Sequence, residues 1–397
     1  MNAAEKKATF ALASVFAIRM LGLFMLLPVL SLYALHLTHS TPLLMGLAVG
    51  IYGLTQAIFQ IPFGTLSDKF GRKKIIVLGF VIFILGSIVA AFSTSIAGLI
   101  LGRALQGAGA VGSTIIALLA DLTDDENRTT AMAIIGSSIG VTFAISVILG
   151  PLLKNQFGVH SIFWITAVLG VFAILVTLFL IPTPTKSEFH PDAEPTPKLF
   201  WQMLKNKQLL RLDIGILLSH ALLTMTFVGL PIALKHVMDP NGHGQWLIYL
   251  PTLLLAFICM VPMIIVAEKK SKMKTMLLLA IFMIICSEFL FWVAHHSLAS
   301  LIVSMFIFFT AFSFLEAALP SLISKLAPKS TKGTAMGIYS SAQFLGIFLG
   351  GYLGGFLYQH GHLNSIYSTA VLLACLWFYS AWHMSPVKKV VDDKVVE

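Results

Sequence analysis

The stretch "GTLSDKFGRKK", from Gly64 to Lys74, interrupts an otherwise apolar part of the chain. Long apolar runs precede and follow it, whereas the stretch itself combines two glycines and an acid with several basic residues. Three interpretations compete: a phosphate-binding loop, a basic signal of membrane topology, or a moving part. The first is excluded because the stretch lacks the pattern G-x-x-x-x-G-K-[ST] and follows no predicted strand.

The composition indicates an integral membrane protein. Of 397 residues, 57% are hydrophobic and 11% are charged, and the mean hydropathy is +0.91. Soluble domains carry about 25% charged residues. The net charge of +9 does not indicate a nucleic-acid partner, because the basic residues fall in short connections between apolar runs. We also expect no metal, cofactor or enzymatic activity, because the three cysteines lie inside apolar segments and no connection holds a catalytic cluster.

Twelve segments are apolar enough to cross a membrane. A helix needs about 20 such residues to span the hydrocarbon core, and irregular backbone cannot face lipid, so the spans are predicted to be helices. The basic residues Lys6 and Lys7 precede an apolar run too long for a cleaved signal peptide, so we expect the first helix to be retained. The predicted spans are 9–35, 42–63, 75–93, 97–121, 129–153, 161–182, 209–234, 244–267, 275–295, 298–323, 334–358 and 365–383.

The basic residues predict the orientation. If the N-terminus is cytoplasmic, all but five of the 26 lysines and arginines fall in cytoplasmic connections or at the two chain ends. The exceptions are Lys154 and Lys235 in outer connections, and Arg19, Arg103 and Arg211 within or at the ends of spans. The excess of basic residues in cytoplasmic loops therefore supports twelve spans with both termini in the cytoplasm. The predicted location is the inner, cytoplasmic membrane.

The sequence divides into two related halves. We expect a six-helix bundle over 1–182, a cytoplasmic linker over 183–208, a second bundle over 209–383 and a cytoplasmic tail over 384–397. "IPFGTLSDKFGRKK" is echoed by "VPMIIVAEKKSKMK", and "RTTAMAIIGSS" by "KGTAMGIYSSA", at nearly the same offset. Repeated membrane halves are typical of transporters whose binding site lies between them.

These motifs resemble the major facilitator superfamily, and in particular its twelve-helix, proton-coupled exporters of the YajR type. The opening stretch matches the pattern G-x-L-x-D-x-x-G-R-K between helices 2 and 3, and "LILGRALQGAGA" matches an antiporter-associated pattern in helix 4. The residues matching the first pattern are Gly64, Leu66, Asp68, Gly71, Arg72 and Lys73. In helix 5, Gly140, Gly150 and Pro151 match an antiporter motif only in part, since Lys154 and Asn155 replace its paired glycines.

The resemblance implies roles for the opening stretch. In the superfamily the motif acid, here Asp68, meets the inner N-terminus of helix 11 in the outward-open state and bridges the two halves, an arrangement that suits the positive end of a helix. Arg72 would meet an acid at the inner end of helix 4, for which Asp121 is the candidate. Gly64 and Gly71 would permit close helix approach and a tight turn. Alternatively, Asp68 only caps the turn while the basic residues only set the topology.

Two arginines lie inside predicted spans of the first half, where a charge is costly. By resemblance, Arg103 takes part in proton coupling; the alternative is a structural bond to carbonyls of helix 1. Arg19 has no mid-span acid in its half, so we expect it, with Gln106, to line a substrate cavity. The alternative for Arg19 is a hydrogen-bonded structural anchor.

The second half supplies candidate proton carriers. Glu316 is the best carboxylate for reversible protonation, because helix 10 lines the cavity in the superfamily. His220, near the centre of helix 7, can exchange protons at physiological pH, although a packed histidine is the alternative. Together they form a predicted relay. Asp213 is expected to pair with Arg211, and Glu288 to have a scaffold or lipid-edge role.

The sequence thus favours a monomeric, proton-driven exporter of small amphipathic compounds that works by alternating access in the lipid bilayer. Its expected partners are protons and a small-molecule substrate. A sugar or metabolite exporter or uniporter of the same fold is the alternative. A transport-inactive sensor is a more remote one.

Overall fold

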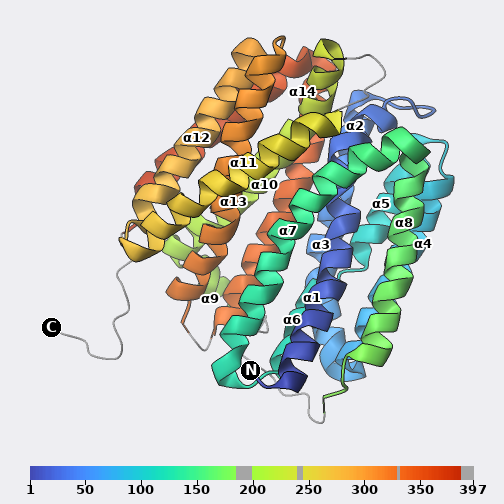
Figure 1. The fold of residues 1–397 in the computed structure, drawn as a ribbon, viewed down its shortest axis with the longest axis vertical. Helices are drawn as coiled ribbons and strands as arrows, with labels where there is room; N and C mark the ends of the chain where they lie inside the picture. Colours follow the sequence, from blue (N-terminus) through green and yellow to red (C-terminus); the bar gives the residue numbers. More distant parts are fainter. Residues whose placement is uncertain (185–198, 239–244, 329–330, 386–397) are drawn as a thin grey trace.

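The structure is a computed structural model that describes residues 1–184, 199–238, 245–328 and 331–385. Over these residues it is almost entirely helical (Figure 1). The helices are α1 (Ala3–Phe24), α2 (Leu27–Ala34), α3 (Pro42–Phe70), α4 (Arg72–Phe92), α5 (Ile96–Ala108), α6 (Gly112–Asp121), α7 (Asp125–Phe157), α8 (Val159–Leu175) with a π-helical turn at Val176–Leu180, α9 (Phe200–Leu204), α10 (Lys207–Val237), α11 (Gln245–Lys269), α12 (Met273–Ala294), α13 (Leu298–Leu326) and α14 (Lys332–Trp382).

The helices account for the twelve predicted spans. Eleven helical segments of the described chain are long and apolar enough to cross a membrane, and α1 with α2, like α5 with α6, forms one of them. The last segment, α14, has non-helical backbone at Gly361 and His362 and therefore contains the final two spans. Several helix ends differ from the predicted ones by a few residues. The difference that matters for the site is in the second span, which was predicted to end at residue 63, whereas α3 continues to Phe70. Asp68 therefore lies on a helix and not in a loop.

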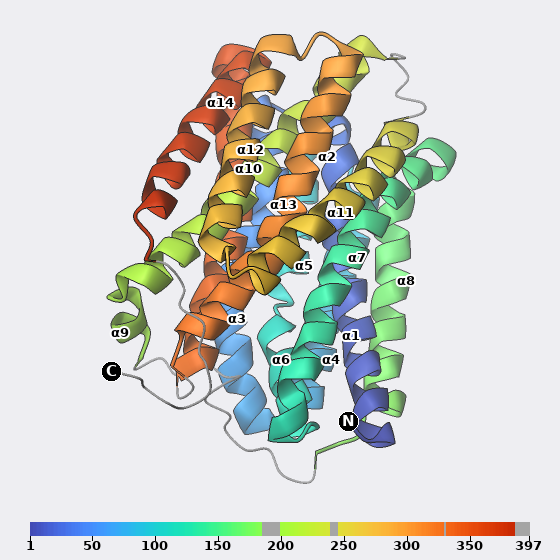
Figure 2. The ribbon, with the colours of Figure 1, turned by 60° about the vertical axis from the view of Figure 1, so that its left-hand side comes forward.

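Two groups of helices lie side by side. In Figures 1 and 2, α1–α8 occupy one side of the molecule and α10–α14 the other, with α7 beside α11 at the boundary. The closest boundary contact joins α3 to α14, where the backbones touch through Gly46, Gly351 and Gly355. A Cβ on Gly351 would lie 2.7 Å from the carbonyl oxygen of Gly46. Part of the predicted linker (185–198) and of the tail (386–397) lies outside the described residues.

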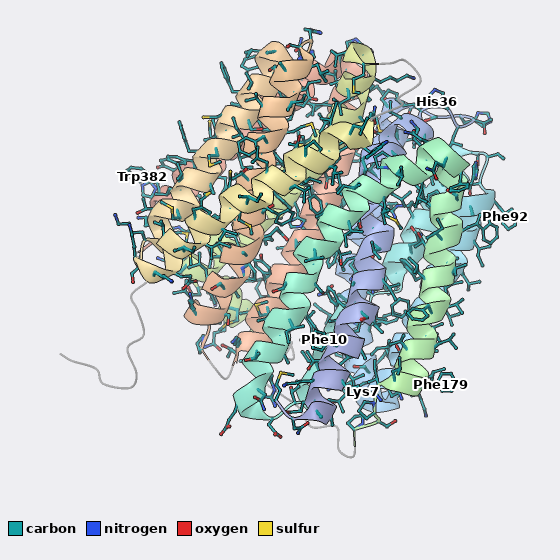
Figure 3. The ribbon with its side chains drawn as sticks, viewed as in Figure 1. Lys7, Phe10, His36, Phe92, Phe179 and Trp382 are labelled. Carbon is teal, nitrogen blue, oxygen red and sulfur yellow. The ribbon has the colours of Figure 1, made fainter. Side chains whose placement is uncertain are left out.

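The outer surface of the helices is apolar. Phe92, Phe179 and Trp382 point away from the molecule (Figure 3), and each leaves more than half of its surface exposed. Such a surface would aggregate in water, but it suits a hydrocarbon environment, where Trp and other aromatic residues gather near the interfaces. The burial pattern therefore agrees with the composition: this is a multi-pass membrane protein.

Two spans are broken within the membrane region. Between α5 and α6 the backbone leaves the helical conformation at Gly109, and between α1 and α2 a short turn lies at Met25 and Leu26. A broken helix leaves carbonyl groups without an intrahelical partner, and lipid cannot satisfy them. Residues of neighbouring helices contact each break: Arg19 bonds to the Gly109 carbonyl, and Gly150 packs against the Met25 carbonyl.

Candidate functional site

Arg72 organises the inner end of the first half. Gly71 separates α3 from α4 with φ of +93°, a value that glycine adopts without a steric penalty. This turn buries the guanidinium of Arg72, which donates to Ser67 Oγ at 2.8 Å, pairs with Asp68, and reaches Asp121 Oδ2 at 3.2 Å. The predicted contact between Arg72 and Asp121 is therefore present, and it ties the start of α4 to the end of α6. Its role in gating stays a prediction.

Asp68 behaves differently from Asp121. The side chain of Asp68 is 45% exposed, and its ion pair is with Arg72 of the same half. The bridge from Asp68 to the N-terminus of α14 that the resemblance implies is not formed among the residues described here. At Gly64, where a close helix approach is expected, a Cβ would meet Ser113 Oγ at an ordinary contact distance of 3.4 Å in this conformation. The role of Gly64 stays a prediction.

The second half carries a charge-swapped counterpart. Glu268, the echo of Asp68, ends α11 and accepts from Lys325 Nζ at 2.7 and 2.9 Å. Lys325 lies at the end of α13, much as Asp121 lies at the end of α6. Both side chains are more than 40% exposed, unlike Arg72 and Asp121. Both halves therefore have an ion pair between corresponding helix ends. In the first half a buried arginine forms it, and in the second half an exposed glutamate pairs directly with a lysine.

Arg19 stabilises the break between α5 and α6. Its guanidinium, 1% exposed, donates to the Gly109 carbonyl at 2.5 Å, to the Tyr52 hydroxyl at 3.2 Å, and to Gln56. The Gly109 carbonyl lies at the point where the helix is interrupted. It accepts from the Val111 amide at 2.9 Å, and Arg19 adds a second, charged donor to the same oxygen. The geometry gives Arg19 the anchoring role that was the alternative in the sequence analysis. Direct contact with a substrate stays a prediction, and the guanidinium is not accessible in this conformation.

Arg103 and Gln106 lie in the same buried network. Arg103 lies over the ring of Tyr52, 5.0 Å from its centroid, and donates to Gln106 Oε1 at 2.8 Å. The Gln106 amide donates in turn to Ser87 Oγ on α4 at 2.8 Å. Gln106 therefore faces another helix of its own half and not the boundary, so its predicted place in a substrate cavity is not supported by this conformation. Tyr52 contacts both arginines, and nothing in the sequence singled it out.

The three motif residues of the fifth span, which is α7, differ in how closely they are packed. Gly150 packs against the Met25 carbonyl at the break between α1 and α2, so closely that a Cβ would overlap it. Pro151 follows within α7. A Cβ added to Gly140 would have no neighbouring heavy atom within 4 Å among the residues that the structure describes. Of the two glycines, only Gly150 has a packing role here.

His220 and Glu316 lie together in the second half, although 96 positions separate them in the chain. His220 Nδ1 is 3.6 Å from Glu316 Oε1, and His220 Nε2 is 2.8 Å from the side-chain amide of Gln343 on α14. The His220 side chain is 1% exposed and that of Glu316 is 23% exposed. An imidazole and a carboxyl at this separation can share a proton after a small side-chain movement. Sequence reasoning missed Gln343, the long polar side chain inside its span.

An aromatic cluster lies next to this pair and joins the two halves. The Phe312 ring lies 5.6 Å from His220 and 5.7 Å from Phe143 of α7, and Phe143 also contacts Phe24 at 5.1 Å. Phe312 and Glu316 are four residues apart on α13 and therefore share one face of that helix. The ionisable pair thus lies at the boundary between the two halves and not inside one bundle.

Hydrogen bonds across the boundary occur at the end of the molecule opposite to the N-terminus. Ser31 of α2 donates to the Phe227 carbonyl of α10 at 3.4 Å, and the amide of Leu43 donates to Gln359 at 3.2 Å. The glycine contacts of α3 with α14 lie near the same end of the molecule. At the other end Asp68 pairs within its own half. The halves are therefore held together at the predicted outer face.

Of the other two acids of the second half, Asp213 differs from expectation, whereas Glu288 agrees with the scaffold role and not with the lipid-edge one. Arg211 donates to the His383 carbonyl at 2.5 Å and does not pair with Asp213, whose Oδ1 has no hydrogen-bond partner among the described residues. Glu288 is fully buried and not at the lipid edge, because α12 turns it towards Thr226 of α10. No group of three or more potential ligands among the described residues could hold a metal ion.

These features define a multi-pass membrane transporter: twelve spans in two groups, a repeated inner motif, and polar residues at the boundary between the groups. The sequence model of the Major Facilitator Superfamily matches residues 12–351 and 246–395, and the chain belongs to this superfamily.

The comparisons agree at the level of sequence and fold. The chain is 45% identical over 377 residues, covering 95% of it and 83% of the relative, to the inner membrane transport protein YajR of Escherichia coli. It is 31% identical over 150 residues, 38% of the chain and 37% of the relative, to the class B tetracycline resistance protein of Escherichia coli. The crystal structure of the nucleoside transporter NupG superposes with a TM-score of 0.74 at 15% identity, covering 95% of this chain and 99% of that one. At that identity the likeness shows the fold alone.

Proposed function

We propose that the protein is a proton-coupled antiporter that exports small amphipathic compounds across the inner membrane by alternating access. The observation that carries the proposal is the proximity of His220 and Glu316, 3.6 Å apart at the boundary of the two halves. Their elements, α10 and α13, belong to the same half, and an aromatic contact through Phe312 reaches the other half. A change of protonation at this pair would therefore act where the halves meet.

The coupling follows from the cost of burying net charge. With one proton fewer than a neutral pair, Glu316 carries a negative charge one helical turn from the apolar ring of Phe312, which contacts Phe143 of the other half. Closing the halves over that charge would remove it from water at a cost of several kcal/mol. Binding one proton leaves either a neutral pair or an ion pair with no net charge, and closure becomes less costly. Proton binding and the movement of the halves are then linked.

The aromatic cluster suits an amphipathic substrate. Phe143 makes tilted contacts with Phe309 and Phe312 across the boundary and an edge contact with Phe24 within its own half. Such rings offer adaptable apolar surface without fixed hydrogen-bond geometry. The relative that confers tetracycline resistance supports a drug-like substrate. The membrane potential would contribute about 2.3 kcal/mol per elementary charge for each 100 mV. The protein would work as a monomer, with both termini in the cytoplasm.

Efflux from proteoliposomes tests the proposal. Wild-type protein is reconstituted with tetracycline as the first probe of a substrate panel, and a pH gradient is imposed and then collapsed with an ionophore. We expect gradient-driven transport by the wild type and its loss in Glu316→Gln, with exchange of substrate retained. Glu126→Gln is the matched control, since it removes an exposed acid at the start of α7 that is not part of the boundary pair. Transport that survives collapse of the gradient, or gradient-driven transport in Glu316→Gln, contradicts proton coupling at this pair.

The alternative, an exporter or uniporter of a sugar or metabolite, is separated by the same preparation. Counterflow that is insensitive to pH on both sides would favour it. A protein that moves no compound of the panel, and that no compound stabilises against heat, would favour the transport-inactive sensor.

A further inference from the structure

Glu288 is a buried carboxyl that the proposed transport cycle does not use. It lies in α12, is 0% exposed, and is surrounded by helices of the second half. No lysine or arginine of the described chain forms an ion pair with it, and its Oε2 has no hydrogen-bond partner there. A carboxylate in such a place is costly unless it is neutralised. The neighbouring hydrogen bonds show how it is neutralised.

Thr226 has one hydroxyl hydrogen but makes two short oxygen contacts, which indicates that the carboxyl of Glu288 is protonated. Thr226 Oγ1 lies 2.7 Å from Glu288 Oε1 and 2.8 Å from the Leu222 carbonyl. A carbonyl oxygen accepts only, and the threonine hydroxyl has one hydrogen to donate. If that hydrogen goes to Leu222, the contact with Glu288 is a hydrogen bond only when the carboxyl donates. Both short contacts are therefore satisfied together when Glu288 carries a proton.

Buried polar groups lie on each helix around Glu288. The ring of Tyr367 on α14 stacks on Phe291, three residues after Glu288, with centroids 5.3 Å apart. The hydroxyl groups of Tyr367 and of Tyr249 on α11 are buried without a partner in the described chain. On α13, Ser304 lies next to α12, since Ser287 donates to its carbonyl at 2.8 Å. None of these groups is a cation that could balance a carboxylate.

A series of titratable groups leads from Glu288 to the surface. His295 follows the last residue of α12, seven positions after Glu288 and about 10 Å further along the helix direction. Its ring lies 5.8 Å from Tyr367 and 4.0 Å from the exposed His296. His295 Nδ1 lies 3.0 Å and 3.2 Å from two carbonyl oxygens, so Nδ1 carries the hydrogen and Nε2 is free to take up a proton. This end of α12 is opposite to the N-terminus (Figure 2).

We propose that Glu288 is a second proton-binding site, occupied in this conformation, and that Tyr367 and His295 carry its proton to and from the predicted outer face. In this conformation the Tyr367 hydroxyl has no hydrogen-bond partner among the described residues, so the transfer requires a side-chain movement that brings it to both groups. One proton then leaves the carboxyl for the Tyr367 oxygen while the phenolic proton moves to Nε2 of His295. Tyr367 is unchanged, Glu288 becomes an anion and His295 a cation. The site lies inside the second half, in contrast to the boundary pair of His220 and Glu316.

Infrared spectroscopy of the full-length protein in lipid tests the site directly. At neutral pH we expect the carbonyl stretch of a buried protonated carboxylic acid, which is lost in Glu288→Gln. Glu268→Gln is the control, because that acid is exposed and paired with Lys325, so its removal should leave the band unchanged. A full band in Glu288→Gln overturns the proposal. If that variant does not fold, Thr226→Val replaces it: loss of the acceptor oxygen must shift the band, and an unshifted band overturns the assignment.

Exchange into D2O tests the route. Deuteration shifts the same band, and the rate of that shift reports how fast Glu288 exchanges its proton. We expect exchange to slow in Tyr367→Phe and in His295→Phe, while His36→Phe, a histidine at the same end but in the connection after α2, leaves the rate unchanged. Equal rates in the wild type and both route variants overturn the route. Neither measurement uses a substrate or a gradient, so the outcome is independent of whether Glu316 couples transport.

Discussion

Replacement of Arg72 should destabilise the protein far more than replacement of the acid beside it. The Arg72 side chain is 2% exposed and that of Asp121 is 0% exposed, and Nε lies 3.2 Å from Oδ2. At this distance and an effective dielectric constant of 20, the attraction is about 5 kcal/mol before desolvation is subtracted. Removing one partner of a buried pair costs about 3–5 kcal/mol, because the other charge stays buried. Arg72→Gln should therefore lower the free energy of unfolding by about that amount.

Asp68→Asn should have a much smaller effect. Its side chain is 45% exposed although it contacts the same guanidinium, and exposed ion pairs contribute about 0.2–1 kcal/mol. Reversible unfolding in mixed micelles measures the free energy of unfolding of each variant. Double-mutant cycles then give the interaction free energy of each residue pair, from the single variants Arg72→Gln, Asp121→Asn and Asp68→Asn and their double variants. We expect strong coupling between Arg72 and Asp121 and weak coupling between Arg72 and Asp68.

Two results would refute this reasoning. If Arg72→Gln and Asp68→Asn lower the free energy of unfolding equally, burial does not decide the strength of the two contacts. If Arg72→Gln and Asp121→Asn are additive, the two residues do not interact energetically, whatever their distance.

Asp68→Asn should weaken transport while insertion and thermal stability remain near those of the wild type; normal transport would leave the stretch as a topology signal alone. Gly351→Leu should block transport and raise the reactivity of cysteines placed at the outer end of α3, because a side chain cannot fit against the Gly46 carbonyl; unchanged reactivity would contradict closure at this contact. The single reversals Glu268→Lys and Lys325→Glu should each slow transport, and their combination should restore it; failure of the double variant would show that more than charge pairing is involved.

Much of the fold follows from the sequence, for physical reasons. The bilayer demands a helix of about 20 apolar residues for each crossing, so twelve runs predict twelve spans with errors only at their ends. The error at Asp68 arose because α3 continues beyond the apolar run, where charged residues are compatible with helix but not with lipid. The resemblance to the superfamily also implied that Arg72 meets an acid at the inner end of helix 4, with Asp121 as the candidate, and this contact is present.

The side-chain environment could not be read in the same way. Arg19 was a candidate for substrate binding because no acid of its half could pair with it, but the structure supplies a carbonyl freed by the break at Gly109. The sequence contains no signal for that break beyond a glycine. Likewise, Gln106 faces Ser87 because of the rotation of α5 about its axis, which packing decides.

The sequence by itself determined the membrane class, the number of crossings, the duplicated halves and the motif of the opening stretch, since these depend on hydrophobicity and local pattern. Only the tertiary structure decided that His220 lies beside Glu316, that Glu288 is buried against Thr226, and that the halves meet at the end opposite to the N-terminus. Those facts depend on how helices distant in the chain rotate and pack, and one residue of rotation turns a side chain by about 100° around a helix of 3.6 residues per turn.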